Sequence, residues 1–190
     1  MSGTLVGILI ILAAAALFIA LVLRLYNQLV QGRLRVDEGW AQIDVQLKRR
    51  HDLIPNLVNA VRDVMGFEQD VLTRVTEARA NAVTAGARGT GAAAQAENQL
   101  TGALRSLFAV VENYPELKAN QNVLALQEQL STTENQIAFS RQHYNTVVLE
   151  YNTAIATFPS LVLARSLGFL PREFFEAEEE AQQVPTVSLR

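Results

Sequence analysis

Cysteine is absent from the chain, and histidine occurs only twice, at His51 and His143. The absence of cysteine excludes a thiolate nucleophile; it is compatible with a reducing compartment but does not by itself establish one. Neither histidine follows a glutamate by three residues, since Lys48 and Ser140 occupy those positions, so the Glu-x-x-His pairs of di-iron bundles are missing. The chain also has no Gly-x-Ser-x-Gly, and its glycine-rich stretch 82–91 lacks a phosphate-loop pattern. We therefore expect no enzymatic activity, no catalytic or metal-binding residues and no cofactor.

Charge is absent from residues 4–23. About 20 apolar residues match the hydrocarbon thickness of a bilayer, so we predict a transmembrane helix that contacts membrane lipid. A cleaved secretory signal fits poorly, because no Lys or Arg precedes the run and no small-x-small cleavage site follows it. Since Arg24, Arg33 and Arg35 come after the run, the positive-inside rule predicts a single pass, with the N-terminus outside and the rest of the chain in the cytoplasm.

Glycine and proline are absent from residues 117–158, which predicts one helix reaching about 60 Å at 1.5 Å per residue. Steps of three and four along it follow a heptad seam that is mostly apolar or aromatic, which indicates lengthwise packing on other helices. The seam positions are Val123, Leu126, Leu130, Thr133, Ile137, Ser140, Tyr144, Val147, Tyr151, Ala154 and Phe158. Such a seam predicts a partner surface rather than a reaction.

Prolines and a glycine-rich stretch divide the rest of the chain into predicted helices. No breaker follows the apolar run, so we predict that the spanning helix continues into the first bundle helix and that Pro55 separates that helix from the next. The stretch 82–91 predicts a turn before a third helix over residues 92–112, and Pro159 ends the long helix. The expected fold is all-α: a single N-terminal transmembrane helix continuing into an elongated, coiled-coil-like antiparallel four-helix bundle, with short C-terminal tail helices. The expected domains are an anchor (1–23), a bundle (24–158) and an apolar, acidic tail (159–190).

Charge elsewhere is nearly balanced, with a net value of −3. Without a large basic surface we expect no nucleic-acid partner. Charged residues crowd one place, Asp44, Lys48, Arg49, Arg50 and Asp52. Asp44 precedes Lys48 by one helical turn, an order that stabilises a helix, and the cations complement the dipole at a helix's carboxyl end. The alternative is a docking patch for a partner or for other copies.

Two Tyr-Asn pairs, Tyr144-Asn145 and Tyr151-Asn152, repeat at seven residues. A seam tyrosine buries its ring while its hydroxyl seeks a partner, and an asparagine beside the seam can fix helix register. Packing within the chain and contact between copies both remain open. In the tail, Phe174 and Phe175 precede an acidic run and form a further candidate contact. Bilayer contact by residues 161–169 is the weaker idea, because that stretch has little of the basic charge of interfacial helices.

Several segments together resemble the LemA family: residues 43–58 (IDVQLKRRHDLIPNLV), 72–79 (LTRVTEAR), 112–120 (ENYPELKAN) and 141–145 (RQHYN). The resemblance implies a small bacterial membrane protein with an N-terminal spanning helix in the cell (inner) membrane and a cytoplasmic helical bundle. It implies no agreed biochemical activity. Gly39 stands where the family pattern suggests alanine.

From these observations we expect a membrane-anchored structural or scaffold protein that forms a homo-oligomer through its long helical faces. The alternative is a tethered adaptor that recruits a soluble protein partner through the bundle end or the C-terminal tail.

Overall fold

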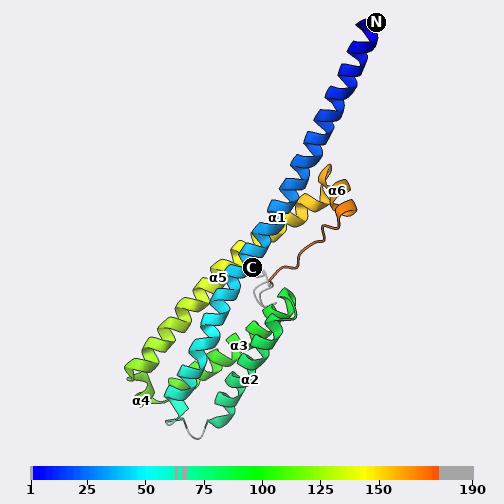
Figure 1. Cartoon of the computed structure of the whole chain (residues 1–190). Helices are drawn as coiled ribbons and strands as arrows, with labels where there is room; N and C mark the ends of the chain where they lie inside the picture. The colour runs from blue at the N-terminus through cyan, green and yellow to red at the C-terminus, as the bar shows by residue number, and fades with distance from the viewer. Residues whose placement is uncertain (1, 63, 66–67, 176–190) are drawn as a thin grey trace, which may run out of the picture. The chain divides into compact units, whose positions relative to one another are not determined.

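The computed structural model of the chain describes residues 2–62, 64–65 and 68–175. Those residues form six helices and no strand (Figure 1), which confirms the all-α prediction. The helices are α1 (Ser2–Arg62), α2 (Gln69–Gly86), α3 (Thr90–Val111), α4 (Pro115–Lys118), α5 (Gln121–Ala156) and α6 (Ser160–Leu167). The predicted acidic residues from Glu176 onward lie outside the described residues.

α1 runs without a break from the apolar segment to Arg62. Its apolar part is long and hydrophobic enough to cross a membrane, and none of that window is buried inside the protein. The continuation into the bundle is therefore confirmed, but the predicted helix end at Pro55 is wrong, because Pro55 lies inside α1.

α1 continues through Pro55 because a side chain on another helix replaces the missing backbone donor. Pro55 has no N–H, so the carbonyl of His51, one turn earlier, loses its helical partner. Arg79 on α2 donates its Nε–H to that carbonyl over 2.6 Å. A contact 28 residues away thus satisfies the acceptor that the proline leaves open, and α1 continues for two more turns.

The predicted turn over residues 82–91 is also mostly wrong. α2 extends to Gly86 because Ala82 and Ala85 are buried and their small side chains permit close packing against α3. The turn narrows to three residues and includes Gly89, whose φ of 118° is open to glycine and strained for other residues.

The described residues fall into two compact units. The first contains the residues up to Trp40 together with Thr146–Arg172, and the second contains Ala41–Asn145 together with the residues from Glu173 onward. α1 and α5 each contribute to both units.

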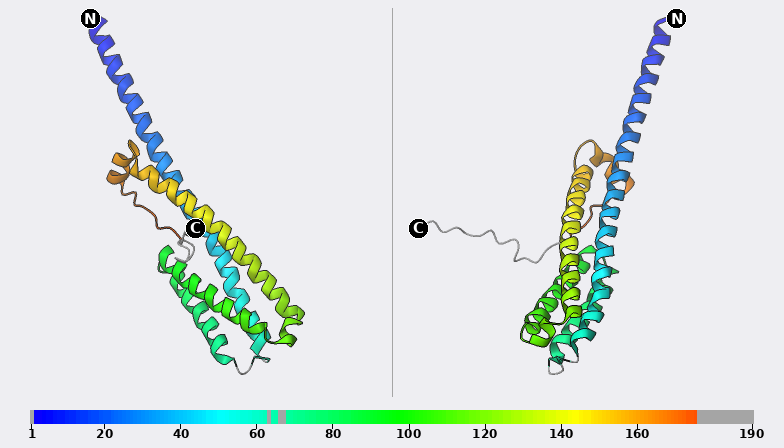
Figure 2. Two further views of the ribbon diagram at one scale, coloured as in Figure 1. Left: turned by 180° about the vertical axis from the view of Figure 1, so that it is seen from behind. Right: turned by 90° about the vertical axis from the view of Figure 1, so that its left-hand side faces the viewer.

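The second unit is the four-helix bundle. α1, α2, α3 and α5 succeed one another in alternating directions around one core, as the two views of Figure 2 show. Leu57, Val75, Leu100 and Val123, one from each helix, are completely buried there. The predicted antiparallel bundle is confirmed.

The heptad seam of α5 is also confirmed over most of its length. Seven of its eleven positions are buried and three are partly buried. Phe158 is the exception: it lies beyond the end of α5 at Ala156 and is 83% exposed.

Candidate interaction site

A buried charged network occupies the bundle of the second unit, at the carboxyl-terminal part of α1. Arg50 donates from Nη2 to the hydroxyl of Thr101 over 2.7 Å, and its Nη1 lies 3.0 Å from Glu134 Oε2. His51 Nε2 lies 2.6 Å from Glu97 Oε1. Arg50, His51 and Glu97 are buried, whereas the side chain of Glu134 is partly exposed.

All four bundle helices contribute to this network. α1 supplies Arg50 and His51, α3 supplies Glu97, α5 supplies Glu134, and Arg79 of α2 binds the His51 carbonyl. A buried ion pair adds little net stability, because desolvation offsets its Coulomb attraction, but a misaligned helix would leave its charges unpaired. We infer that the network fixes which helix faces lie together.

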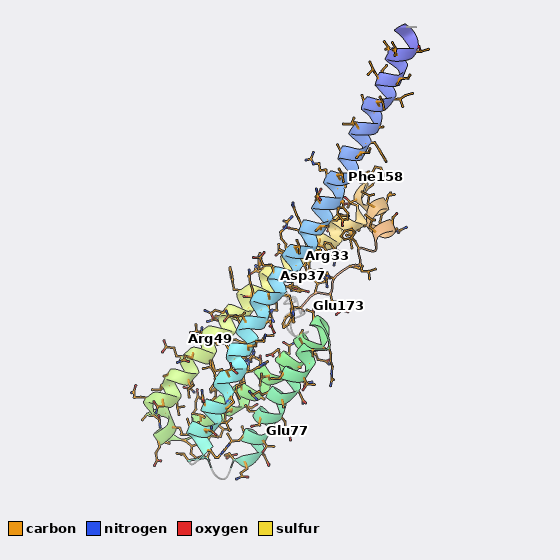
Figure 3. The ribbon with its side chains drawn as sticks, viewed as in Figure 1. Arg33, Asp37, Arg49, Glu77, Phe158 and Glu173 are labelled. Carbon is orange, nitrogen blue, oxygen red and sulfur yellow. The ribbon has the colours of Figure 1, made fainter. Side chains whose placement is uncertain are left out.

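The predicted charged patch is therefore divided. Arg50 belongs to the buried network, whereas Lys48, Arg49 and Asp52 are exposed (Figure 3 labels Arg49). Asp44 and Lys48 form the expected pair one turn apart, with Nζ 2.6 Å from Oδ2. Exposed pairs of this kind contribute about 0.2–1 kcal/mol.

Sequence reasoning missed Glu97 and Thr101 as partners of the patch. A glutamate among alanines gives little local sign of burial, and its partners lie 46 and 47 residues earlier in the chain. Glu134 could have been found from the sequence, because it directly follows the seam residue Thr133. Arg79 could also have been found, because it ends a segment that carries the family resemblance.

The two asparagines of the Tyr-Asn pairs hold the backbone of the tail. In the second unit, Asn145 donates from Nδ2 to the Phe175 carbonyl over 3.0 Å, and its Oδ1 accepts from the Phe175 N–H over 2.9 Å. In the first unit, Asn152 makes the same two bonds to Arg172, both over 2.9 Å. We call these the amide clamps. They bind tail backbone rather than fixing helix register, which is a function that the sequence did not indicate.

Two clamps can form because the distance between the two asparagines along α5 matches the distance between their backbone partners along the tail. They are seven residues apart on α5, a rise of about 10.5 Å, and three residues apart in the tail, which spans about 10 Å when extended. Tyr144 adds a third bond, donating its hydroxyl to the Glu173 carbonyl over 2.9 Å. Phe175 is buried and Phe174 is partly exposed.

Tyr151 differs from Tyr144. Its ring is buried, and its hydroxyl has no hydrogen-bond partner among the described residues. Burial raises the pKa of this phenol, and the cations Arg172 and Arg33 oppose part of that rise.

A second candidate surface lies on the bundle between α1 and α5. A groove of about 370 Å³ is lined by Gln46, Thr132, Asn135, Gln136, Phe139 and Ser140. Phe139 is 75% exposed, and the buried Oε1 of Gln46 has no hydrogen-bond partner within the described part of the chain. The groove therefore offers an exposed apolar anchor.

Comparison with known proteins agrees with the resemblance. The LemA family profile matches residues 39–189. Magnetosome protein MamQ 2 of Paramagnetospirillum magneticum is 27% identical over 90% of this chain and 71% of its own length. Protein LemA of Metamycoplasma hominis is 24% identical over 86% of this chain and 75% of its own. The apolar helix and these relatives indicate a membrane-associated protein, and the chain belongs to the LemA family.

Proposed function

We propose that this protein is a membrane-anchored, non-enzymatic scaffold that self-assembles through the exposed helical face around Phe139. In this proposal residues 4–23 cross the cell (inner) membrane, with the N-terminus outside and the bundle in the cytoplasm. The apolar run and the following arginines support that topology.

The observation that carries the proposal is Phe139 beside the groove. Burying a phenylalanine contributes about 1.5–3 kcal/mol relative to leaving it exposed. Val45 on α1 is also exposed, so apolar side chains are available on both helices that border the groove.

The test uses the full chain in lipid nanodiscs and in mild detergent, with the mass of single particles as the readout. We expect assemblies for the wild type and their loss in Phe139→Asp. The matched control is Val83→Asp, which places the same charge at another exposed apolar position of the bundle, on α2. A wild type that is monomeric in both media, or equal effects of the two variants, would contradict self-assembly through this face.

The alternative function is an adaptor that recruits one soluble protein through the tail. The favouring observation is that the clamps present an extended segment with Phe174 partly exposed. Truncation after Phe175 removes the acidic run and keeps both clamps. Loss of a co-purifying protein with assembly intact would support the adaptor over the scaffold.

A further inference from the structure

The turn between α5 and α6 and the segment after it expose large apolar side chains. Phe158 is 83% exposed, Leu170 73% and Val162 59%. We call residues 158–170 the elbow. All of them belong to the first unit, which also contains the apolar part of α1. Exposed apolar side chains gathered in one short segment indicate a surface that is covered in the working protein.

The elbow lies beside α1 where the apolar run ends. The ring of Phe169 meets the ring of Tyr26 edge to face, with centroids 6.1 Å apart. Tyr26 is three residues past Leu23, a rise of about 4.5 Å. The guanidinium of Arg33 lies 5.7 Å from the centroid of the same Phe169 ring. Figure 3 labels Arg33 on α1 and Phe158 just after α5. If the apolar run crosses the bilayer, the elbow is at the level of the lipid headgroups.

The direction of α6 is compatible with a position at the lipid headgroups. Within the first unit, the end of α5 accompanies α1, with Arg35 Nη1 3.7 Å from Glu150 Oε2. α6 then turns away from α5 by 96°. If the end of α5 runs parallel to the apolar part of α1, a helix at this angle to α5 lies along the membrane surface.

The polar groups of the elbow suit an interface. Ser166 donates its hydroxyl to the Val162 carbonyl over 2.9 Å, so the exposed side of α6 shows little unpaired polarity. Arg165 is exposed, α1 places Arg33 against Phe169, and exposed Arg24 belongs to the same unit. α1 thus adds basic charge to the single arginine of residues 161–169. Long arginine side chains can bury their stems in the apolar layer while their charges meet anionic headgroups.

We propose that the elbow is a second membrane contact, whose apolar side chains enter the headgroup–acyl boundary of anionic phospholipid. This inference rests on the proposed membrane span and goes beyond it, because a single span needs no further lipid contact. The elbow restrains the end of α5 at the bilayer surface.

The absence of cysteine permits a direct test with single-cysteine variants of the full chain. Val162→Cys and Leu170→Cys would carry an environment-sensitive fluorophore in nanodiscs of phosphatidylcholine and phosphatidylglycerol with brominated acyl chains, which quench on contact. Leu12→Cys reports on the span. Glu38→Cys is the exposed control on α1, about 22 Å beyond the apolar run.

We expect loss of fluorescence at Val162, Leu170 and Leu12 and none at Glu38. Quenching at Leu12 without quenching at Val162 and Leu170 would overturn the elbow contact and leave the span intact. No quenching at Leu12 would overturn both the span and the elbow contact. Equal quenching at all four positions, including Glu38, would also refute the elbow as a specific contact.

Discussion

The substitution Arg79→Met tests how α1 continues through Pro55. It removes the Nε–H that binds the His51 carbonyl and retains most of the apolar stem. Because no backbone N–H is available at Pro55, that carbonyl would be left in a buried position without its donor.

The expected cost follows from the geometry. The bond is short, at 2.6 Å, and its donor is charged. Hydrogen bonds to charged groups contribute about 1.5–3 kcal/mol, and we expect the lower half of that range because Arg79 is partly exposed. The matched control is Arg74→Met. Arg74 is exposed on the same helix and donates to the Asp70 carbonyl over 3.3 Å, so we expect a change within about 0.5 kcal/mol.

The decisive measurement is a double-mutant cycle with Pro55→Ala. Alanine restores the N–H that the His51 carbonyl lacks, so Arg79→Met should cost at least about 1 kcal/mol less in that background. Urea unfolding of the full chain in detergent, followed by far-ultraviolet circular dichroism, gives the four free energies. Additive effects, or equal costs for Arg74→Met and Arg79→Met, would refute the reasoning.

Three further predictions concern the network, the clamps and the buried phenol. Glu97→Ala should lower the free energy of unfolding by about 1–3 kcal/mol, because it leaves buried His51 Nε2 without its partner while Arg50 keeps Glu134 and Thr101; a cost below about 0.5 kcal/mol in urea unfolding would contradict this. Asn145→Ala removes two bonds of about 1 kcal/mol each to Phe175 and should speed proteolysis of the tail, whereas Asn135→Ala, at an exposed position on the same helix, should not. The raised pKa of Tyr151 means that the folded state holds the phenol proton more tightly than the unfolded state. The stability that the protonated Tyr151 phenol contributes is therefore complete below pH 10 and is lost as the pH rises further. Tyr151→Phe should make the free energy of unfolding fall less steeply above pH 10, and identical pH profiles for the variant and the wild type would contradict this.

Sequence reasoning predicted the helices better than their ends. The seam of α5 and the apolar run of α1 are periodic or continuous over many residues, so each carries its own signal. The helix end predicted at Pro55 was wrong because a proline in a sequence indicates only a missing local N–H, whereas the donor that replaces this N–H, Arg79, lies on another helix. The Gly-rich stretch misled in the same way, since Ala82 and Ala85 are helical only because α3 packs against them.

Several candidate residues stood out in the sequence, but their contacts did not. Arg50 stood out beside Lys48 and Arg49, but a run of charges does not reveal which member turns inward. Asn145 and Asn152 stood out by their repeat, yet nothing local indicated that tail backbone would be their partner.

By itself the sequence determined the apolar N-terminal helix, the all-α class, the seam and the family, because hydrophobic periodicity and motif order are properties of neighbouring residues. Only the tertiary structure decided which charges are buried, how α1 passes its proline and what the asparagines hold. Those outcomes depend on pairs that are 20 to 84 residues apart. Such pairs meet only when the bundle closes, and it is then the cost of an unpaired buried group that selects them.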